Sequence, residues 1–212
     1  MNRRNLGRLL TATLSLALLG SAPFVRAAEE APDALIKRVS GEVLDAIKAD
    51  KAIQAGETSR VLALVDTKVM PNVNFTRMTA SAVGRNWRQA TPEQKAKLQS
   101  EFKTLLVRTY SGALSQVSDQ KLNIKPLRAG ADDTDVTVRT EVLGRGDPVQ
   151  LDYRMEKTPT GWKIYDLNVL GVWLVETYRT QFAQEINAKG IDGLIAAMSQ
   201  RNQTNNAGGA KS

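Results

Sequence analysis

The chain has 212 residues, of which 42% are hydrophobic, 29 are basic and 22 are acidic, and it contains neither cysteine nor histidine. Without cysteine it cannot form a disulfide, a thiolate nucleophile or a thiolate metal site. Without histidine it lacks a Ser-His-Asp triad, an imidazole general base and the usual zinc ligand. Much enzyme chemistry is thereby excluded, and we expect no catalytic residues, no metal site and no organic cofactor.

The first 27 residues have the pattern of a secretory signal peptide. Arg3, Arg4 and Arg8 lie beside an uncharged apolar run from Leu9 to Leu19, and Val25-Arg26-Ala27 has small residues at the usual cleavage spacing. That run of eleven residues is shorter than the roughly 20 that a membrane-spanning helix needs. We therefore expect cleavage after Ala27 and export to the periplasm.

The remaining 185 residues suit a single domain with its own core. The signal holds four basic residues and no acidic one, so 25 basic and 22 acidic residues remain, a net charge of +3. Such a weak charge does not favour nucleic-acid binding, which usually requires a concentrated basic face. We expect one domain over residues 28–201 and a disordered polar, glycine-rich tail over 202–212.

Apolar residues at helical spacing predict helices over 33–55, 58–69 and 72–88, with Pro71 ending the second. Thr91-Pro92-Glu93-Gln94 has the pattern of a capping box with proline at the first helical position, which predicts the start of a long helix. This helix carries one broad apolar stripe, formed by Leu98, Phe102, Leu105, Leu106, Tyr110, Ala113 and Leu114.

After Ser118 the apolar period changes from 3.6 to 2, as expected of half-buried strands. Four strands are predicted over 122–127, 136–142, 149–157 and 162–169, and the short turns between the later ones make them antiparallel. A last helix follows and is interrupted at Gly190. The order of elements indicates an α+β fold, a four-stranded antiparallel sheet with helices packed on one side.

Several motifs in this order resemble one known family. They are Asn74-Phe75-Thr76-Arg77-Met78 with Gly84 and Trp87, the 91–94 capping box, Gly161-Trp162-Lys163-Ile164-Tyr165-Asp166, and Tyr178-Arg179-Thr180-Gln181-Phe182. Together they resemble the MlaC family, the toluene-tolerance auxiliary components of an ABC transporter. The chain departs from the family at two places, since aspartate is expected at Asn74 and Glu-Gly-Val-Ser at 170–173.

The resemblance implies a periplasmic phospholipid carrier with an NTF2-like fold. Such a protein holds the acyl chains of a diacyl phospholipid in an apolar cavity between sheet and helices. It shuttles this cargo between an outer-membrane lipoprotein–porin complex and an inner-membrane ABC transporter complex, which maintains outer-membrane lipid asymmetry. The bound phospholipid is cargo and not a cofactor.

Large apolar side chains are the candidate lipid-binding residues: Phe75, Met78, Trp87, Phe102, Leu105, Leu106, Tyr110, Val138, Leu151, Tyr153, Met155, Trp173, Leu174 and Tyr178. For any one of them ordinary core packing is an alternative, because every amphipathic element shows such a stripe. Arg179 is the candidate head-group contact, since guanidinium binds phosphate in a bidentate fork. Its alternative is an ion pair or hydrogen bond that orients the last helix.

Two other functions remain open from the residues alone. A small NTF2-like enzyme would need a carboxylate in an apolar pocket, for which Glu141, Asp152 and Asp166 are candidates. A periplasmic lipoprotein carrier or chaperone would bind acylated protein in an apolar groove.

Overall fold

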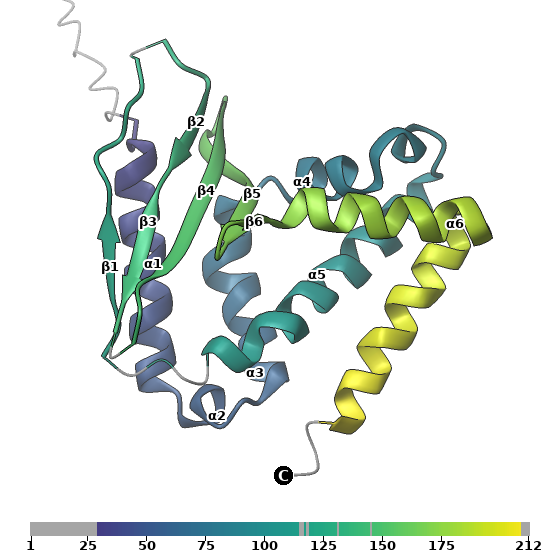
Figure 1. Cartoon of the computed structure of the whole chain (residues 1–212), viewed down its shortest axis with the longest axis horizontal. Helices are drawn as coiled ribbons and strands as arrows, with labels where there is room; N and C mark the ends of the chain where they lie inside the picture. Colours follow the sequence, from purple (N-terminus) through teal and green to yellow (C-terminus); the bar gives the residue numbers. More distant parts are fainter. Residues whose placement is uncertain (1–28, 115–116, 118, 131, 145, 209–212) are drawn as a thin grey trace, which may run out of the picture.

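The computed structural model describes residues 29–114, 117, 119–130, 132–144 and 146–208, and the predicted signal peptide lies outside them. Helix α1 (Pro32–Ala49) packs on one face of an antiparallel sheet. Helices α4 (Phe75–Val83), α5 (Pro92–Leu114) and α6 (Leu174–Gly208) pack against one another beside the sheet (Figure 1). The predicted α+β class is confirmed. None of the helices within these ranges is long and apolar enough to cross a membrane.

The sheet has six strands where four were predicted. They are β1 (Lys121–Ile124), β2 (Asp135–Val138), β3 (Thr140–Leu143), β4 (Val149–Thr158), β5 (Gly161–Val169) and β6 (Val172–Trp173). The predicted strand over 136–142 is divided at Arg139, whose carbonyl oxygen accepts a hydrogen bond from the Lys125 amide at 2.9 Å. Strand β6 has only two residues, so it shows no alternation that a sequence pattern could detect.

The first predicted helices are shorter than expected. The helix expected over 33–55 ends at Ala49 and is followed by α2 (Lys51–Gln54), because the Asp50 carboxylate accepts the Ala52 amide at 2.9 Å and caps a new helix. The segment 58–72 contains α3 (Thr58–Leu64), the π-helical turn η1 (Val65–Val69) and the 3₁₀ turn η2 (Met70–Asn72). A further 3₁₀ turn, η3 (Gly84–Arg88), follows α4.

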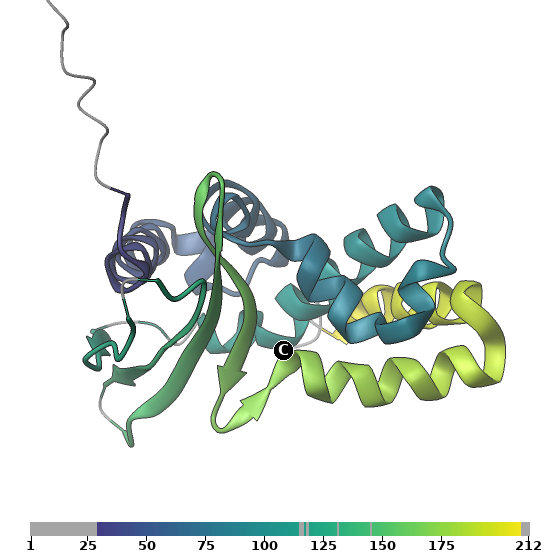
Figure 2. The same ribbon diagram turned by 90° about the horizontal axis from the view of Figure 1, so that it is seen from above.

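The start of α5 and the bend within α6 have clear local causes. The capping box of α5 is confirmed, since the Gln94 side chain accepts the Thr91 amide at 3.0 Å and the Thr91 hydroxyl accepts the Gln94 amide at 3.2 Å. Gly190, with φ of 73°, bends α6 where the interruption was predicted, and Figure 2 shows the two halves running in different directions.

The tail predicted from Asn202 overlaps the end of α6, which continues to Gly208. Asn202 is 5% exposed, and its amide nitrogen donates to the Glu101 carbonyl at 3.0 Å. The prediction counted apolar residues only, whereas a polar contact with α5 fixes this turn. Residues 209–212 of the predicted tail lie outside the described residues.

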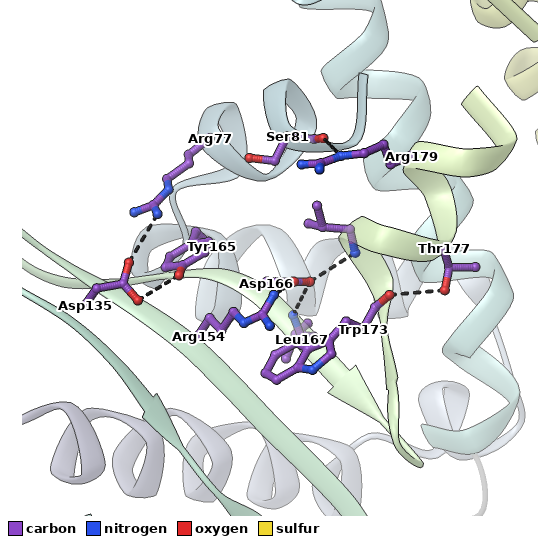
Figure 3. Close-up of polar contacts among 11 residues, drawn as sticks. Arg77, Ser81, Asp135, Arg154, Tyr165, Asp166, Leu167, Trp173, Thr177 and Arg179 are labelled. Atoms are coloured by element: carbon purple, nitrogen blue, oxygen red, sulfur yellow. Dashed lines mark hydrogen bonds and ion pairs between the residues drawn. The ribbon is translucent and has the colours of Figure 1, made fainter. Parts of the chain in front are cut away.

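Asp166 on β5 joins the sheet to the start of α6 (Figure 3). One carboxylate oxygen accepts the Leu167 amide at 2.8 Å and the Val175 amide at 3.1 Å, and the other accepts Arg154 at 3.2 Å. Burial raises the pKa of this carboxyl, which is 1% exposed, although all of these donors act to lower it. The Arg154 guanidinium also lies 3.9 Å from the ring centre of Trp173.

The turn between β5 and β6 holds a leucine in a left-handed conformation. Leu170 has φ of 54° and Gly171 has φ of 88°, and the two residues connect the Val169–Val172 pair. Two positive φ angles are typical of a type I′ hairpin turn, in which asparagine followed by glycine is favoured. Leu170 is 67% exposed, so burial of its side chain contributes little to compensate for the backbone strain.

Replacing Asp166 with alanine is expected to lower the free energy of unfolding by about 3 kcal/mol, because two backbone amides and a partly buried Arg154 lose their acceptor. Asp135→Ala is the matched control, because this carboxylate is 50% exposed and also pairs with an arginine. Its loss should cost at most about 1 kcal/mol. Urea denaturation of both variants measures the difference, and equal losses would contradict the role given to Asp166.

Leu170→Asn is expected to stabilise the protein by about 1 kcal/mol, because asparagine tolerates the left-handed region better than leucine. This gain corresponds to a rise of about 2–4 °C in thermal midpoint for a chain of this size. Val172→Asn, two residues along, should show no gain, because Val172 lies in a strand and has no positive φ. A lower midpoint for Leu170→Asn, measured by circular dichroism, would show that the leucine is not strained.

Candidate functional site

A cavity of about 630 Å³ lies between α1, the α3–η1 segment, α5 and the inner face of the sheet. This volume is within the usual range for a ligand site. Its wall is mostly aliphatic and includes Ile36, Val39, Val43, Leu44, Ile47, Val61, Leu64, Val65, Val69, Met70, Val73, Leu106, Val107, Ala113, Val117, Leu122, Val142, Val149, Leu151, Ile164, Leu167 and Val169. Such a wall can hold an apolar ligand and offers few partners to a polar one.

Helix α5 contributes to the cavity with part of its apolar stripe. Leu106 and Tyr110 line the cavity together with Val107. Phe102, one turn before Leu106, is fully buried against α6, with its ring centre 4.9 Å from Tyr178 and 5.2 Å from Phe182. The single broad stripe seen in the sequence therefore passes from packed core at Phe102 to cavity wall at Val107, and Leu106 and Tyr110 contact both.

Two tyrosines, Tyr110 and Tyr153, line this cavity. Tyr153 on β4 faces Ser40 and Thr140, and burial raises the pKa of its phenol to about 12 despite the hydrogen bonds to these two residues. Burial also raises the pKa of Tyr110. Both phenols are therefore neutral at physiological pH, so neither supplies a base for catalysis.

The structure places half of the fourteen predicted lipid-binding residues at the cavity. Those at the wall are Phe75, Met78, Leu106, Tyr110, Leu151, Tyr153 and Leu174. Those away from it are Trp87, Phe102, Leu105, Val138, Met155, Trp173 and Tyr178.

The seven residues away from the wall have other surroundings. Phe102, Leu105 and Tyr178 belong to the packed core between α4, α5 and α6, and Trp87 packs against that core from η3. Val138 and Met155 are fully buried between the sheet and α1. Trp173 lies beside Arg154 near the start of α6. The apolar spacing that suggested them is common to core and cavity.

Sequence reasoning missed the contribution of α1 and of the α3–η1 segment. Ile36, Val39, Val43 and Ile47 recur at helical spacing, which correctly predicted the helix, but none of them was among the candidate lipid-binding residues. The selection favoured aromatic residues and methionines, whereas this wall is built of branched aliphatic side chains. No signal in the spacing distinguishes a stripe that faces a space from one that faces another helix.

The predicted polar residues lie outside the cavity wall. The Arg179 Nε donates to the Ser81 carbonyl at 2.9 Å and so links α6 to α4, which agrees with its structural alternative (Figure 3). Glu141 pairs with Lys125 at 2.6 Å, and Asp152 accepts the Thr140 amide at 3.1 Å. Neither they nor Asp166 lines the cavity, and the described residues contain no acidic cluster that could hold a metal ion.

Comparisons with known proteins identify relatives of this chain. The family model "MlaC protein" matches residues 37–200. The intermembrane phospholipid transport system binding protein MlaC of Haemophilus influenzae is 25% identical over 177 residues, covering 82% of this chain and 83% of that protein. The toluene tolerance protein ttg2D of Pseudomonas putida is 26% identical over 179 residues, covering 84% and 83% respectively.

A solved structure is more similar in sequence. The phospholipid-binding protein of Ralstonia solanacearum, determined in complex with a phospholipid, is 48% identical, with a TM-score of 0.80 over 82% of this chain and 97% of that one. The family match spans most of the described residues, and the similar structure has the same fold. The chain belongs to the MlaC family.

Proposed function

We propose that this protein is a phospholipid carrier that holds the acyl chains of one diacyl phospholipid in the cavity between α1, α5 and the sheet. The observation that carries the proposal is the aliphatic wall of that cavity, in a chain 48% identical to a protein that was solved with a phospholipid bound. Each 16-carbon chain kept from water represents about 12 kcal/mol, at about 0.8 kcal/mol per methylene. A cavity between the helices and the sheet meets this requirement, whereas a shallow groove does not.

We propose that the exported protein carries its cargo through the periplasm between an outer-membrane lipoprotein–porin complex and an inner-membrane ABC transporter complex. The name of the Haemophilus relative, which describes intermembrane phospholipid transport, supports this route. A signal peptide over residues 1–27 would place the protein in that compartment.

A carrier fits the site better than the enzyme alternative. The three candidate carboxylates, Glu141, Asp152 and Asp166, lie away from the cavity and are engaged in hydrogen bonds or ion pairs. The two phenols at the wall are held in their neutral form by burial. We therefore propose that the protein binds and releases phospholipid without chemical change, and that the phospholipid is cargo.

Leu106→Trp is expected to lower the amount of phospholipid that co-purifies with the protein several-fold while leaving the lipid-free protein folded. The larger side chain fills space that the ligand would occupy. Val138→Trp is the control, because Val138 is 0% exposed in the packed layer between sheet and α1. Its overpacking should cost about 1–3 kcal/mol of stability.

Mass spectrometry of organic extracts and thermal melting of lipid-stripped protein measure both quantities. A stable Leu106→Trp variant with a full complement of phospholipid would place the cargo elsewhere. Wild-type protein that yields acylated peptide and no phospholipid would favour the lipoprotein-carrier alternative instead.

The mature protein is expected to begin at Ala28, and intact-mass measurement of periplasmic material tests this. The mass should equal that of residues 28–212, because Val25 and Ala27 provide the small residues that signal peptidase requires. Ala27→Arg should block cleavage and retain the higher mass. Wild-type protein that keeps residues 1–27 would contradict export by a cleaved signal.

A further inference from the structure

The cavity wall includes one basic side chain, Lys103, which the binding of a neutral acyl chain does not require. Lys103 on α5 is the one basic residue among the described residues that line the cavity, and Asp147 is the one acidic residue. The Lys103 Nζ lies 2.7 Å from the Asp66 carboxylate of η1, and the side chains of Lys103 and Asp66 are 27% and 48% exposed. The ammonium is therefore close enough to solvent to exchange one partner for another.

The position of Lys103 on the helix fits the two parts of a lipid. The long methylene stem of lysine can lie along an apolar wall while its ammonium remains at the rim. Leu106, Val107 and Tyr110 follow on the same face and line the cavity, so the apolar path starts within one turn of the lysine. A ligand with an anion at one end and hydrocarbon beyond it matches this arrangement.

Charge also distinguishes two parts of the cavity wall. Asp147 and Gly146 line it at the connection between β3 and β4, a different part of the wall from the η1–α5 contact. A phosphodiester anion is attracted to an ammonium and repelled by a carboxylate. The anionic part of a phospholipid is therefore favoured at Lys103 and disfavoured at the β3–β4 connection.

We infer that Lys103 is the phosphate-binding residue of the carrier and that Asp66 is a counter-ion which the lipid phosphate displaces. This inference rests on the proposed function and identifies the part of the cavity wall that contacts the head group. Lys103 takes the head-group role that the sequence analysis gave to Arg179. Arg179 donates to the Ser81 carbonyl and does not line the cavity. The location of Asp66 in a π-helical turn agrees with a functional segment, because such turns are frequent at functional sites.

The test compares two ligands that differ in the phosphate. Lipid-stripped protein is titrated with dioleoyl phosphatidylglycerol and with dioleoylglycerol, each in competition with a fluorescent fatty-acid probe. Lys103→Met should weaken phosphatidylglycerol binding about tenfold and leave dioleoylglycerol unchanged, because one hydrogen bond to a charged group is lost. Asp66→Asn should strengthen phosphatidylglycerol binding, because it removes the competing carboxylate.

Lys68→Met is the matched control. Lys68 also lies in η1 and also has an ion pair, with Glu42 at 3.3 Å, but does not line the cavity. Its loss should leave the preference for phosphatidylglycerol unaltered. Inorganic phosphate at matched ionic strength should not displace either lipid, since it lacks the hydrocarbon that fills the cavity.

Each other outcome overturns the inference. If Lys103→Met and Asp66→Asn reduce stability alike and leave the ligand preference unchanged, the ion pair only ties η1 to α5. If Lys68→Met reproduces the effect, general positive charge is responsible. If inorganic phosphate alone binds in a Lys103-dependent way, the site is for a free anion. Wild-type protein that binds neither lipid would reject the proposed function itself.

Discussion

The structure depends on the burial of the apolar stripe of α5. Phe102 anchors this stripe in the aromatic core with Tyr178 and Phe182, and this core packs α5 against α4 and α6. Leu106 and Tyr110 contact the same core and also line the cavity beneath α1 and the sheet. Phe75, Met78 and Leu174 likewise belong to the core and line the cavity. The close-packed core therefore forms one side of the cavity and holds the residues that border it in place.

Polar contacts fix the parts that hydrophobic packing leaves free. Asp166 connects β5 to α6 through the Val175 amide, and Asn74 connects α4 to β4. Asn74 departs from the aspartate expected in the family, and the structure offers a physical reason. Its oxygen accepts the Arg77 amide at 3.0 Å while its nitrogen donates to Glu156 at 2.7 Å. An aspartate at this position would face the Glu156 carboxylate as a like charge.

Much of the fold could be predicted from periodicity and turn residues, and the cavity wall only in part. The capping box at Thr91, the break at Gly190 and the α+β class were confirmed because each rests on local chemistry. The six-stranded sheet was missed because β6 is too short for a period and the division at Arg139 depends on pairing with distant strands. Half of the predicted lining residues lie elsewhere. An apolar stripe indicates that a face is buried, but it does not indicate whether that face contacts other protein residues or a ligand.

Photo-cross-linking tests most directly whether the cavity holds acyl chains. A phosphatidylglycerol with a diazirine on one acyl chain is bound to the lipid-free protein, irradiated, and located by mass spectrometry of peptides. We expect saturable adducts on cavity-lining segments of α1, α5 and β4, competed by unlabelled phospholipid, since these segments line the same space. Adducts confined to residues outside the cavity, or adducts that unlabelled phospholipid does not reduce, would contradict phospholipid binding in this cavity.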